Sequence, residues 1–232
     1  MMKEWQTKRP DLFTRQVVSH TEHDTYNQDL IENKNETLDS GKNLTWSSNE
    51  ISVVMRSCLK KQKPLCIWLT GLSGSGKSSI ANALEQSLHS DGYHTMLLDG
   101  DNMRHGLCRD LAMDEQSRRE NIRRAGEVAR ILFDAGLIVI AAFISPYHVD
   151  RAEARKLFDA NDFFEIYVKT PLNICEKRDP KGHYERARAG KITQFTGIDS
   201  PYEEPHAPEV TVDTSRDNLR DIVDHIKGHI YP

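Results

Sequence analysis

Residues 66–78 read Cys66-Ile67-Trp68-Leu69-Thr70-Gly71-Leu72-Ser73-Gly74-Ser75-Gly76-Lys77-Ser78, an apolar run that ends in Gly-x-x-x-x-Gly-Lys-Ser. Glycines at these positions let the backbone curl so that successive N–H groups face phosphate oxygens. The positive N-terminal end of the helix-compatible segment that follows adds to this attraction. The alternative is a Gly/Ser-rich turn without a ligand, but all eight motif positions match and both flanking elements are present. The stretch therefore predicts a phosphate-binding loop for a nucleoside triphosphate.

The side chains of this loop suit a nucleotide that is bound together with Mg²⁺. Lys77 can reach the β- and γ-phosphates, and the hydroxyl of Ser78 can ligate the metal ion. We expect the nucleotide to be bound by Gly71, Leu72, Ser73, Gly74, Ser75, Gly76, Lys77, Ser78 and Ser79.

Composition narrows the classes of partner and compartment. The chain has 232 residues, of which 38% are hydrophobic and 28% are charged, and its net charge is −4. It has no long basic block, which argues against a nucleic-acid partner, and no apolar run of membrane-spanning length, so we expect no membrane partner. The four cysteines are irregularly spaced and form no Cys-x-x-Cys pair, which is typical of a reduced, cytoplasmic protein.

The chain divides into two parts by composition. Residues 1–50 are rich in Asp, Glu, Asn, Thr and Ser and poor in aliphatic residues, which predicts a polar N-terminal extension that is extended or partly ordered. Residues 51–232 are predicted to form the domain that carries the phosphate loop. Within this domain, residues 178–208 are rich in charge, Gly and Pro. A long polar segment of this kind is usually a lid or a disordered connection.

The order of apolar segments predicts an α/β fold. Strand-like runs occur at 65–70, 95–98, 137–144, 163–168 and 209–212, and helix-like segments at 49–61, 78–90, 115–135, 149–158, 171–177 and 219–226. Strands that alternate with helices imply a five-stranded parallel sheet with helices on both faces. Right-handed crossovers then place every strand-end loop on one edge, where we expect the active site.

Acidic residues at the end of the second strand predict a metal-linked site. Phosphoryl transfer needs a carboxylate near Mg²⁺ and often another group that accepts a proton from the acceptor hydroxyl. Because the third strand ends without an acid, we assign these roles to Asp99 and Asp101. The alternative is a pair of turn-forming aspartates around Gly100.

A group of arginines follows these aspartates and suggests an anionic acceptor. Arginine forms planar, paired hydrogen bonds with phosphate and sulfate oxygens. The group consists of Arg104, Arg118, Arg119, Arg123 and Arg124, with Asn121 among them. A solvated helix face is the usual alternative for such a run.

Six motifs, in order along the chain, resemble the adenylylsulfate kinase family. They are Gly71-Leu72-Ser73-Gly74-Ser75-Gly76-Lys77-Ser78, Leu98-Asp99-Gly100-Asp101-Asn102, Glu120-Asn121-Ile122-Arg123-Arg124, Phe143-Ile144-Ser145-Pro146, Arg178-Asp179-Pro180-Lys181-Gly182 and Phe195-Thr196-Gly197-Ile198-Asp199. The resemblance covers about residues 65–212. It implies a P-loop kinase-type three-layer fold and transfer of the ATP γ-phosphoryl group to the 3′-hydroxyl of adenosine 5′-phosphosulfate. The product would be 3′-phosphoadenylyl sulfate, in sulfate assimilation.

The same resemblance implies partners and residue roles. ATP and Mg²⁺ would be the cofactors, and the chain would form a homodimer and could associate with ATP sulfurylase. The residues implied in catalysis are Lys77, Asp99, Asp101 and Ser145; in Mg²⁺ binding, Ser78 and Asp99; on the ATP side, Arg178 and Lys181; and in acceptor binding, Asp101, Arg104, Arg118, Asn121, Ile144, Ser145 and Phe195.

Two of these residues carry more specific expectations. Phe195 would stack on the adenine ring of the acceptor. Ser145 matches a serine that is described in this family as a phosphoserine intermediate. Because direct in-line transfer needs no covalent step, we expect Ser145 to contact the acceptor instead.

One position departs from the family pattern and keeps other functions open. Asp110-Leu111 is followed by Ala112-Met113, where the family usually has Gly-Phe, with the phenylalanine on the second face of the adenine. Methionine can pack on a ring through its polarizable sulfur. The alternatives are a related small-molecule kinase with another hydroxyl acceptor, or a catalytically silent nucleotide-binding regulatory protein.

Overall fold

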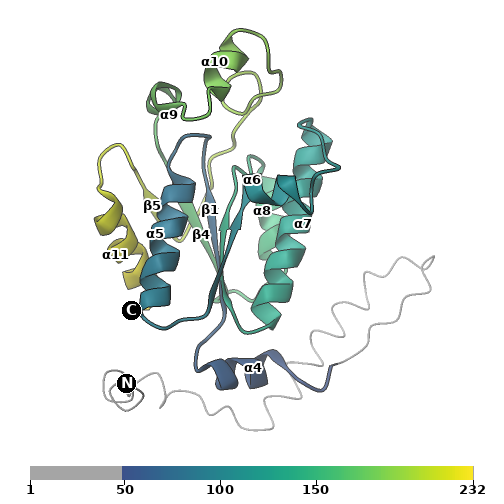
Figure 1. The fold of residues 1–232 in the computed structure, drawn as a ribbon, viewed down its shortest axis with the longest axis vertical. Helices are drawn as coiled ribbons and strands as arrows, with labels where there is room; N and C mark the ends of the chain where they lie inside the picture. Colours follow the sequence, from purple (N-terminus) through teal and green to yellow (C-terminus); the bar gives the residue numbers. More distant parts are fainter. Residues whose placement is uncertain (1–48, 232) are drawn as a thin grey trace, which may run out of the picture. The chain divides into compact units, whose positions relative to one another are not determined.

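A computed structural model describes residues 49–231 of the chain, and all structural statements below concern this range (Figure 1). The predicted polar extension, residues 1–50, lies outside the described residues except for its last two positions. No helix among residues 49–231 is long and apolar enough to cross a membrane.

Five parallel strands form the centre of the described domain. In spatial order they are β2 (Thr95–Asp99), β3 (Ile138–Ala142), β1 (Leu65–Thr70), β4 (Phe163–Val168) and β5 (Val210–Val212). The central strand β1 is buried along its whole length, which explains why its sequence is apolar without alternation. The predicted five-stranded parallel sheet is confirmed, although β3 is shorter at both ends than the apolar run 137–144.

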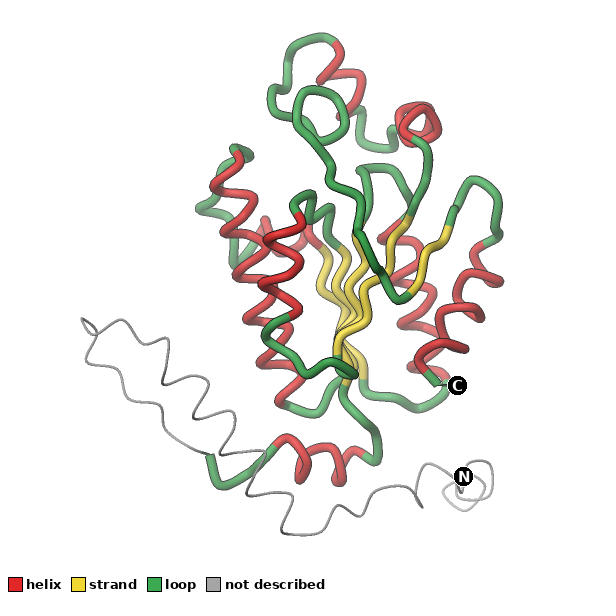
Figure 2. The backbone as a smooth tube through the Cα atoms, turned by 180° about the vertical axis from the view of Figure 1, so that it is seen from behind, coloured by secondary structure: helices red, strands yellow, loops and turns green. Residues whose placement is uncertain are grey.

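Helices cover both faces of this sheet, as Figures 1 and 2 show. The eight described helices are α4 (Val53–Lys60), α5 (Lys77–Ser90), α6 (Gly100–His105), α7 (Glu115–Asp134), α8 (His148–Arg155), α9 (Leu172–Arg178), α10 (His183–Arg188) and α11 (Leu219–Ile230). Helices α5 and α11 lie on one face, and α7 and α8 lie on the other.

Alternate residues of β1 point into two separate cores, because successive side chains of a strand face opposite sides. Ile67 and Leu69 belong to the core beneath α5 and α11, which also contains Leu84 and Ile226. Trp68 belongs to the other core, beneath α7, where it stacks on other aromatic rings. One short strand therefore anchors both layers of helices and fixes the position of the loop that follows it.

Two short helices correct the sequence-based prediction. Residues 100–105 form α6, for which no helix was predicted, because the Asp99 carboxylate accepts a hydrogen bond from Asp101 N (3.0 Å) and caps the helix. Residues 183–188 form α10 inside the segment 178–208, whose polar composition predicts a lid or a disordered connection and no element of the core. That prediction is wrong at Tyr184, whose side chain is buried.

The carboxyl-terminal ends of the parallel strands lie at one edge of the sheet, as predicted. The phosphate loop follows β1, α6 follows β2, and the segment that carries α9 and α10 follows β4. Figure 1 shows α6, α9 and α10 grouped at this edge, while α4 lies at the other.

At the opposite edge, the amide of Gln62 holds three backbone groups together. Its Nε2 donates to His94 O and Gly136 O, both at 2.9 Å, and its Oε1 accepts from His94 N at 2.8 Å. These bonds connect the residues just before β1 with the residues just before β2 and β3.

We predict that Gln62→Ala lowers the free energy of unfolding by about 1–3 kcal/mol, because the buried carbonyl of Gly136 and the part-buried N–H of His94 lose the partner that Gln62 supplies. Urea denaturation measures this change. Gln86→Ala, at an exposed position on α5, is the matched control and should alter the unfolding free energy by less than about 0.5 kcal/mol. Equal unfolding curves for wild type and Gln62→Ala would contradict the role given to this amide.

Candidate active site

A cleft of about 830 Å³ lies at the edge of the sheet where the strands end. Most of the residues singled out from the sequence line it: Ser73, Gly74, Gly76, Lys77, Ser78, Ser79, Asp99, Asp101, Arg104, Arg118, Asn121, Ile144, Ser145, Arg178, Lys181 and Phe195. Gly71, Leu72 and Ser75 belong to the same loop but do not line the cleft. The fold therefore brings together motifs that are more than a hundred residues apart in the chain.

The phosphate loop takes a path that requires glycine at two positions. Gly74 has φ +72°, and a Cβ at this residue would lie 2.9 Å from Cys175 O. Gly71 has φ +151°, and a Cβ there would lie 2.6 Å from Val168 O. Since side chains would clash with backbone at both positions, the glycine pattern is explained by the close approach of the loop to β4 and α9.

Three side chains that the sequence analysis missed hold this loop in place. The carbonyl of Ser75 accepts hydrogen bonds from Thr170 Oγ1 (3.0 Å) and Thr214 Oγ1 (2.8 Å). The hydroxyl of Tyr184 donates to Ser73 O at 2.9 Å. With its carbonyls occupied in this way, the loop keeps its N–H groups available for an anion.

Arg178 reinforces this arrangement from the end of α9. Its guanidinium donates to Thr214 O at 2.8 Å and to Thr214 Oγ1 at 2.7 Å. Thr170 and Thr214 belong to no sequence motif that would have marked them as part of the site. The only signal in the sequence was that Thr170 and Thr214 come shortly after apolar strands and so lie at the predicted edge.

Lys77 lies at the bottom of the loop with its ammonium group buried. The residue is 8% exposed, and Nζ donates to Leu72 O at 2.6 Å. Burial lowers the pKa of Lys77 to about 8, although the charges of Asp99 and Asp101 act in the opposite direction. A negatively charged ligand in the loop would favour the protonated form.

A hydroxyl and a carboxylate lie side by side at the start of α5 and the end of β2. Ser78 Oγ donates to Asp99 Oδ2 at 2.8 Å. Hard oxygen donors of this kind fit Mg²⁺, which usually takes only one or two protein ligands and completes its shell with phosphate oxygens and water. Among residues 49–231 no group of three or more His, Cys, Asp or Glu could hold a metal by itself.

Asp101 lies in the first turn of α6 and forms an ion pair with Lys181. This contact joins the segment after α9 to α6, and both residues line the cleft. Both side chains are more than half exposed, so the pair can separate at little cost.

Two buried polar atoms mark a second binding region in the cleft. Asn121 is 4% exposed, and neither its Oδ1 nor Arg118 Nε has a hydrogen-bond partner among the described residues. Buried polar atoms without partners are costly and indicate a missing ligand or water. Arg104 is close by, and burial lowers the pKa of its guanidinium.

The remaining donors of Arg118 are already used. Its Nη1 donates to Gln194 O (2.7 Å) and its Nη2 to Ser200 Oγ (3.0 Å), so Arg118 holds the loop that carries Phe195. The other arginines of the run pair elsewhere: Arg119 with Asp150, Arg123 with Glu120, and Arg124 with Asp110 and Glu120. These three arginines are therefore engaged in ion pairs and do not line the cleft.

Phe195 and Met113 both line the cleft. The Phe195 ring packs edge-on against Tyr184, with centroids 4.9 Å apart and planes at 80°. Met113 is 59% exposed, so its position is much less fixed by packing than that of Phe195.

Ser145 lines the cleft through a constrained stretch of backbone. It is 1% exposed and has φ +38°. Its Oγ accepts from Trp68 Nε1 (3.1 Å) and donates to Thr70 Oγ1 (3.0 Å), and Arg151 Nη1 donates to its carbonyl at 2.6 Å. The hydroxyl is therefore engaged with the core.

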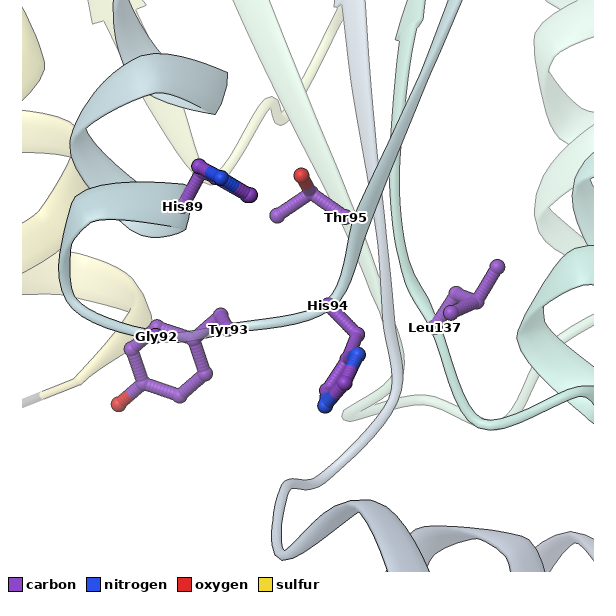
Figure 3. A pocket seen from close by; sticks show the side chains of 6 residues that line it. All are labelled: His89, Gly92, Tyr93, His94, Thr95 and Leu137. Atoms are coloured by element: carbon purple, nitrogen blue, oxygen red, sulfur yellow. The ribbon is translucent and has the colours of Figure 1, made fainter. Parts of the chain in front are cut away.

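The charge of the cleft is opposite to that of the chain. Its lining includes six cationic side chains, Lys77, Arg104, Arg118, Arg178, Lys181 and Arg186, and three aspartates, whereas the chain as a whole carries −4. A separate hollow of about 310 Å³ at the opposite edge is lined by His89, Gly92, Tyr93, His94, Thr95 and Leu137 (Figure 3). It has no lysine, arginine, aspartate or glutamate, so the cationic cleft is the better site for phosphates.

Comparison with known proteins identifies the family of this chain. The family model described as adenylylsulphate kinase matches residues 63–213. The adenylyl-sulfate kinase of Marinobacter nauticus is 55% identical over 188 residues, which are 81% of this chain and 94% of the relative. That of Aeromonas salmonicida is 58% identical over 168 residues, which are 72% of this chain and 86% of the relative.

A solved structure extends the similarity to three dimensions. The APS kinase of Mycobacterium tuberculosis, solved in complex with AMPPNP and APS, has a TM-score of 0.70 and 44% sequence identity. The match covers 73% of this chain and 99% of that chain. This chain belongs to the adenylylsulphate kinase family.

Proposed function

We propose that this chain transfers the γ-phosphoryl group of ATP to the 3′-hydroxyl of adenosine 5′-phosphosulfate and forms 3′-phosphoadenylyl sulfate. One observation carries the proposal: a phosphate loop, a carboxylate pair and a second cationic region with unpartnered polar atoms line the same cleft. The Mycobacterium tuberculosis relative, solved with AMPPNP and APS, supports the same pair of ligands here.

The phosphate loop and α5 hold the ATP phosphates. Lys77 supplies positive charge to the β- and γ-phosphates, where it is most useful as the bridging oxygen leaves. Ser78 and Asp99 would hold Mg²⁺, which would neutralise charge on the phosphates. Arg178 and Lys181 cover the ATP from the side of α9.

Asp101 orients the acceptor hydroxyl and accepts its proton. Its carboxylate pairs with Lys181 in the described structure. When phosphates enter, the ammonium of Lys181 gains a stronger anionic partner, which leaves the Asp101 carboxylate free to accept a hydrogen bond from the 3′-hydroxyl.

The second region of the cleft binds the acceptor. Arg104 and Arg118 supply hydrogen bonds to its phosphosulfate oxygens, because planar guanidinium donors suit these groups. Asn121 can add a hydrogen bond to these oxygens only through its Nδ2, since its unpartnered Oδ1 is an acceptor. Phe195 stacks on the adenine, and Met113 packs on the other face. Ser145 and Ile144 shape this region through their backbone, since the Ser145 hydroxyl is used by Trp68 and Thr70.

Transfer is direct, from ATP to the acceptor, with no phosphoserine. A serine hydroxyl that is 1% exposed and both accepts and donates hydrogen bonds in the core is poorly placed to become a nucleophile. Residues 51–232 form the catalytic domain, and residues 178–208 act as a lid that excludes water from the reacting groups.

We also propose the wider setting of the enzyme. All four cysteines are free, and three of them are buried, which suits a reducing, cytoplasmic location. A homodimer and an association with ATP sulfurylase remain proposals drawn from the family resemblance. Sedimentation of the purified chain, alone and with the sulfurylase, tests both.

The function is tested by measuring ADP release with Mg²⁺-ATP and a panel of acceptors. Adenosine 5′-phosphosulfate should be turned over in preference to adenosine 5′-phosphate, adenosine and sugars. If another acceptor is preferred, it replaces adenosine 5′-phosphosulfate as the assigned substrate. If no acceptor in the panel causes ADP release, the result favours a catalytically silent, nucleotide-binding regulatory protein.

We predict that nucleotide binding takes up a proton at alkaline pH. Because burial lowers the pKa of Lys77 to about 8, the free protein has a mostly neutral Lys77 at about pH 9. Nearby phosphates favour the ammonium form, so Mg²⁺-ADP should bind with uptake of close to one proton at that pH and much less at about pH 7. Calorimetry in buffers of different ionisation enthalpy measures the uptake.

Lys77→Arg is the control for this proton uptake, since arginine stays charged. It should bind Mg²⁺-ADP without proton uptake at either pH. Equal uptake in wild type and Lys77→Arg would assign the proton to another group.

We predict that Asp101→Asn reduces turnover by at least about 10²-fold and changes ATP affinity little, because it retains the shape but loses basicity. Asp99→Asn should instead weaken the dependence on Mg²⁺, since Asp99 shares the metal with Ser78. Steady-state kinetics at several Mg²⁺ concentrations separate the two variants. If turnover and ATP affinity fall in parallel for Asp101→Asn, this residue has a binding role only.

We predict that Phe195→Ala weakens acceptor binding more than Met113→Ala, because Phe195 is held by packing and Met113 is mostly exposed. Met113→Phe should tighten acceptor binding, but by no more than roughly tenfold, since a ring pair contributes about 0.5–1.5 kcal/mol. Acceptor Michaelis constants and single-turnover rates measure these effects. Unchanged acceptor binding in Phe195→Ala would place the adenine elsewhere.

A further inference from the structure

Tyr184 contacts both substrate regions of the cleft without lining it. It is the most buried residue of α10, 2% exposed, in a segment that is otherwise polar. Its hydroxyl donates to Ser73 O in the phosphate loop at 2.9 Å. Its ring packs edge-on against Phe195, with centroids 4.9 Å apart.

These two contacts are chemically different and can be changed separately. A buried tyrosine hydroxyl needs a partner, and Ser73 O is the one that it has. Burial also raises the pKa of Tyr184, so the hydroxyl stays protonated and remains a donor. The ring contact depends on shape alone and would survive replacement of the tyrosine by phenylalanine.

The helix that carries Tyr184 is short and has a glycine near each end. Gly182 precedes α10 with φ +64°, and Gly190 follows it with φ +69°; a Cβ would meet nothing within 4 Å at either position. The contacts of α10 with its surroundings include the Tyr184 hydroxyl on Ser73 O, the ring contact with Phe195, the Asp179 carboxylate that accepts from two α10 amides, and an ion pair between Arg188 and Glu176. Among these, the Tyr184 hydrogen bond is the one that joins α10 directly to the phosphate loop.

We propose that Tyr184 couples the two substrate sites: nucleotide in the phosphate loop seats Tyr184 on Ser73, and Tyr184 in turn fixes Phe195 for the acceptor. This inference rests on the proposed function, and Tyr184 is a positioning residue, since it touches neither substrate. The loop is already held in place by side chains, and bound phosphates would restrain the Ser73 carbonyl further and so strengthen its hydrogen bond with Tyr184. An acceptor then binds to a Phe195 ring that is already in place, which lowers the entropy that it must lose.

The test measures the affinity of adenosine 5′-phosphosulfate with and without Mg²⁺-ADP, in wild type and in Tyr184→Phe. The ratio of the two dissociation constants is the coupling factor. In wild type we expect at least about fivefold tighter acceptor binding with Mg²⁺-ADP, within the usual range for coupled sites. In Tyr184→Phe the factor should fall to less than about twofold, while acceptor affinity without nucleotide stays within about twofold of wild type.

Two internal checks accompany this measurement. Coupling is reciprocal, so the acceptor must tighten Mg²⁺-ADP binding by the same factor. Tyr93→Phe removes a tyrosine hydroxyl at the opposite edge of the sheet, where Tyr93 borders the second hollow (Figure 3), and should keep the wild-type coupling factor.

The outcomes separate this inference from the proposed function. If wild type does not bind adenosine 5′-phosphosulfate at all, the function itself fails. If it binds the acceptor but the coupling factor is one, or if Tyr184→Phe keeps the wild-type factor, the coupling role of Tyr184 is overturned. A purely structural role would lower both acceptor affinities equally and leave their ratio unchanged, which also overturns it.

A second measurement serves if Tyr184→Phe does not fold. In wild type, Mg²⁺-ADP alone should slow amide hydrogen exchange at residues 194–199, which include Phe195. Unchanged exchange in this loop, while the phosphate loop itself becomes protected, would overturn the proposal.

Discussion

The site depends on hydrogen bonds that fix the carbonyl groups of the phosphate loop. Thr170 and Thr214, at the ends of β4 and β5, both donate to Ser75 O, and Tyr184 donates to Ser73 O. Because these carbonyls are held away, the loop can present N–H groups to phosphate at no cost of rearrangement. The parallel sheet contributes to function chiefly because it brings the ends of β1, β4 and β5 close together. Side chains that follow β4 and β5 can then bind the loop that follows β1.

Electrostatics and burial then divide the cleft into two regions. Near the phosphate loop, burial makes the charged ammonium form of Lys77 less favourable. An anionic ligand would stabilise this charged form. Further along, Asn121 and Arg118 keep buried polar atoms without partners. Both features raise the energy of the empty cleft. A negatively charged ligand favours the ammonium form of Lys77, a ligand acceptor satisfies Arg118 Nε, and a ligand donor satisfies Asn121 Oδ1. The net charge of the chain is negative, so the cationic lining of the cleft differs in sign from the chain as a whole and favours anion binding at this place.

Sequence patterns were sufficient for the sheet and for the loop, because an apolar strand, a glycine spacing and a following helix are all local signals. They were insufficient for α10, where only Tyr184 and Ala187 are buried among six residues, too few to establish a helical period. Thr170 and Thr214 carry no motif, since their role arises only from the proximity of two strand ends. The engagement of the Ser145 hydroxyl with Trp68 and Thr70 is likewise a tertiary contact, which a motif match cannot show.

In the proposed reaction both substrates occupy one cleft at the same time, and the phosphoryl group passes directly from ATP to the acceptor. The stereochemical course of transfer from ATP with an isotopically chiral γ-phosphoryl group tests this most directly. A single in-line displacement inverts the configuration at phosphorus, and inversion is the result that we expect. Retention would require two displacements through a phosphorylated residue, and would contradict both direct transfer and the structural role that the buried hydroxyl of Ser145 has here.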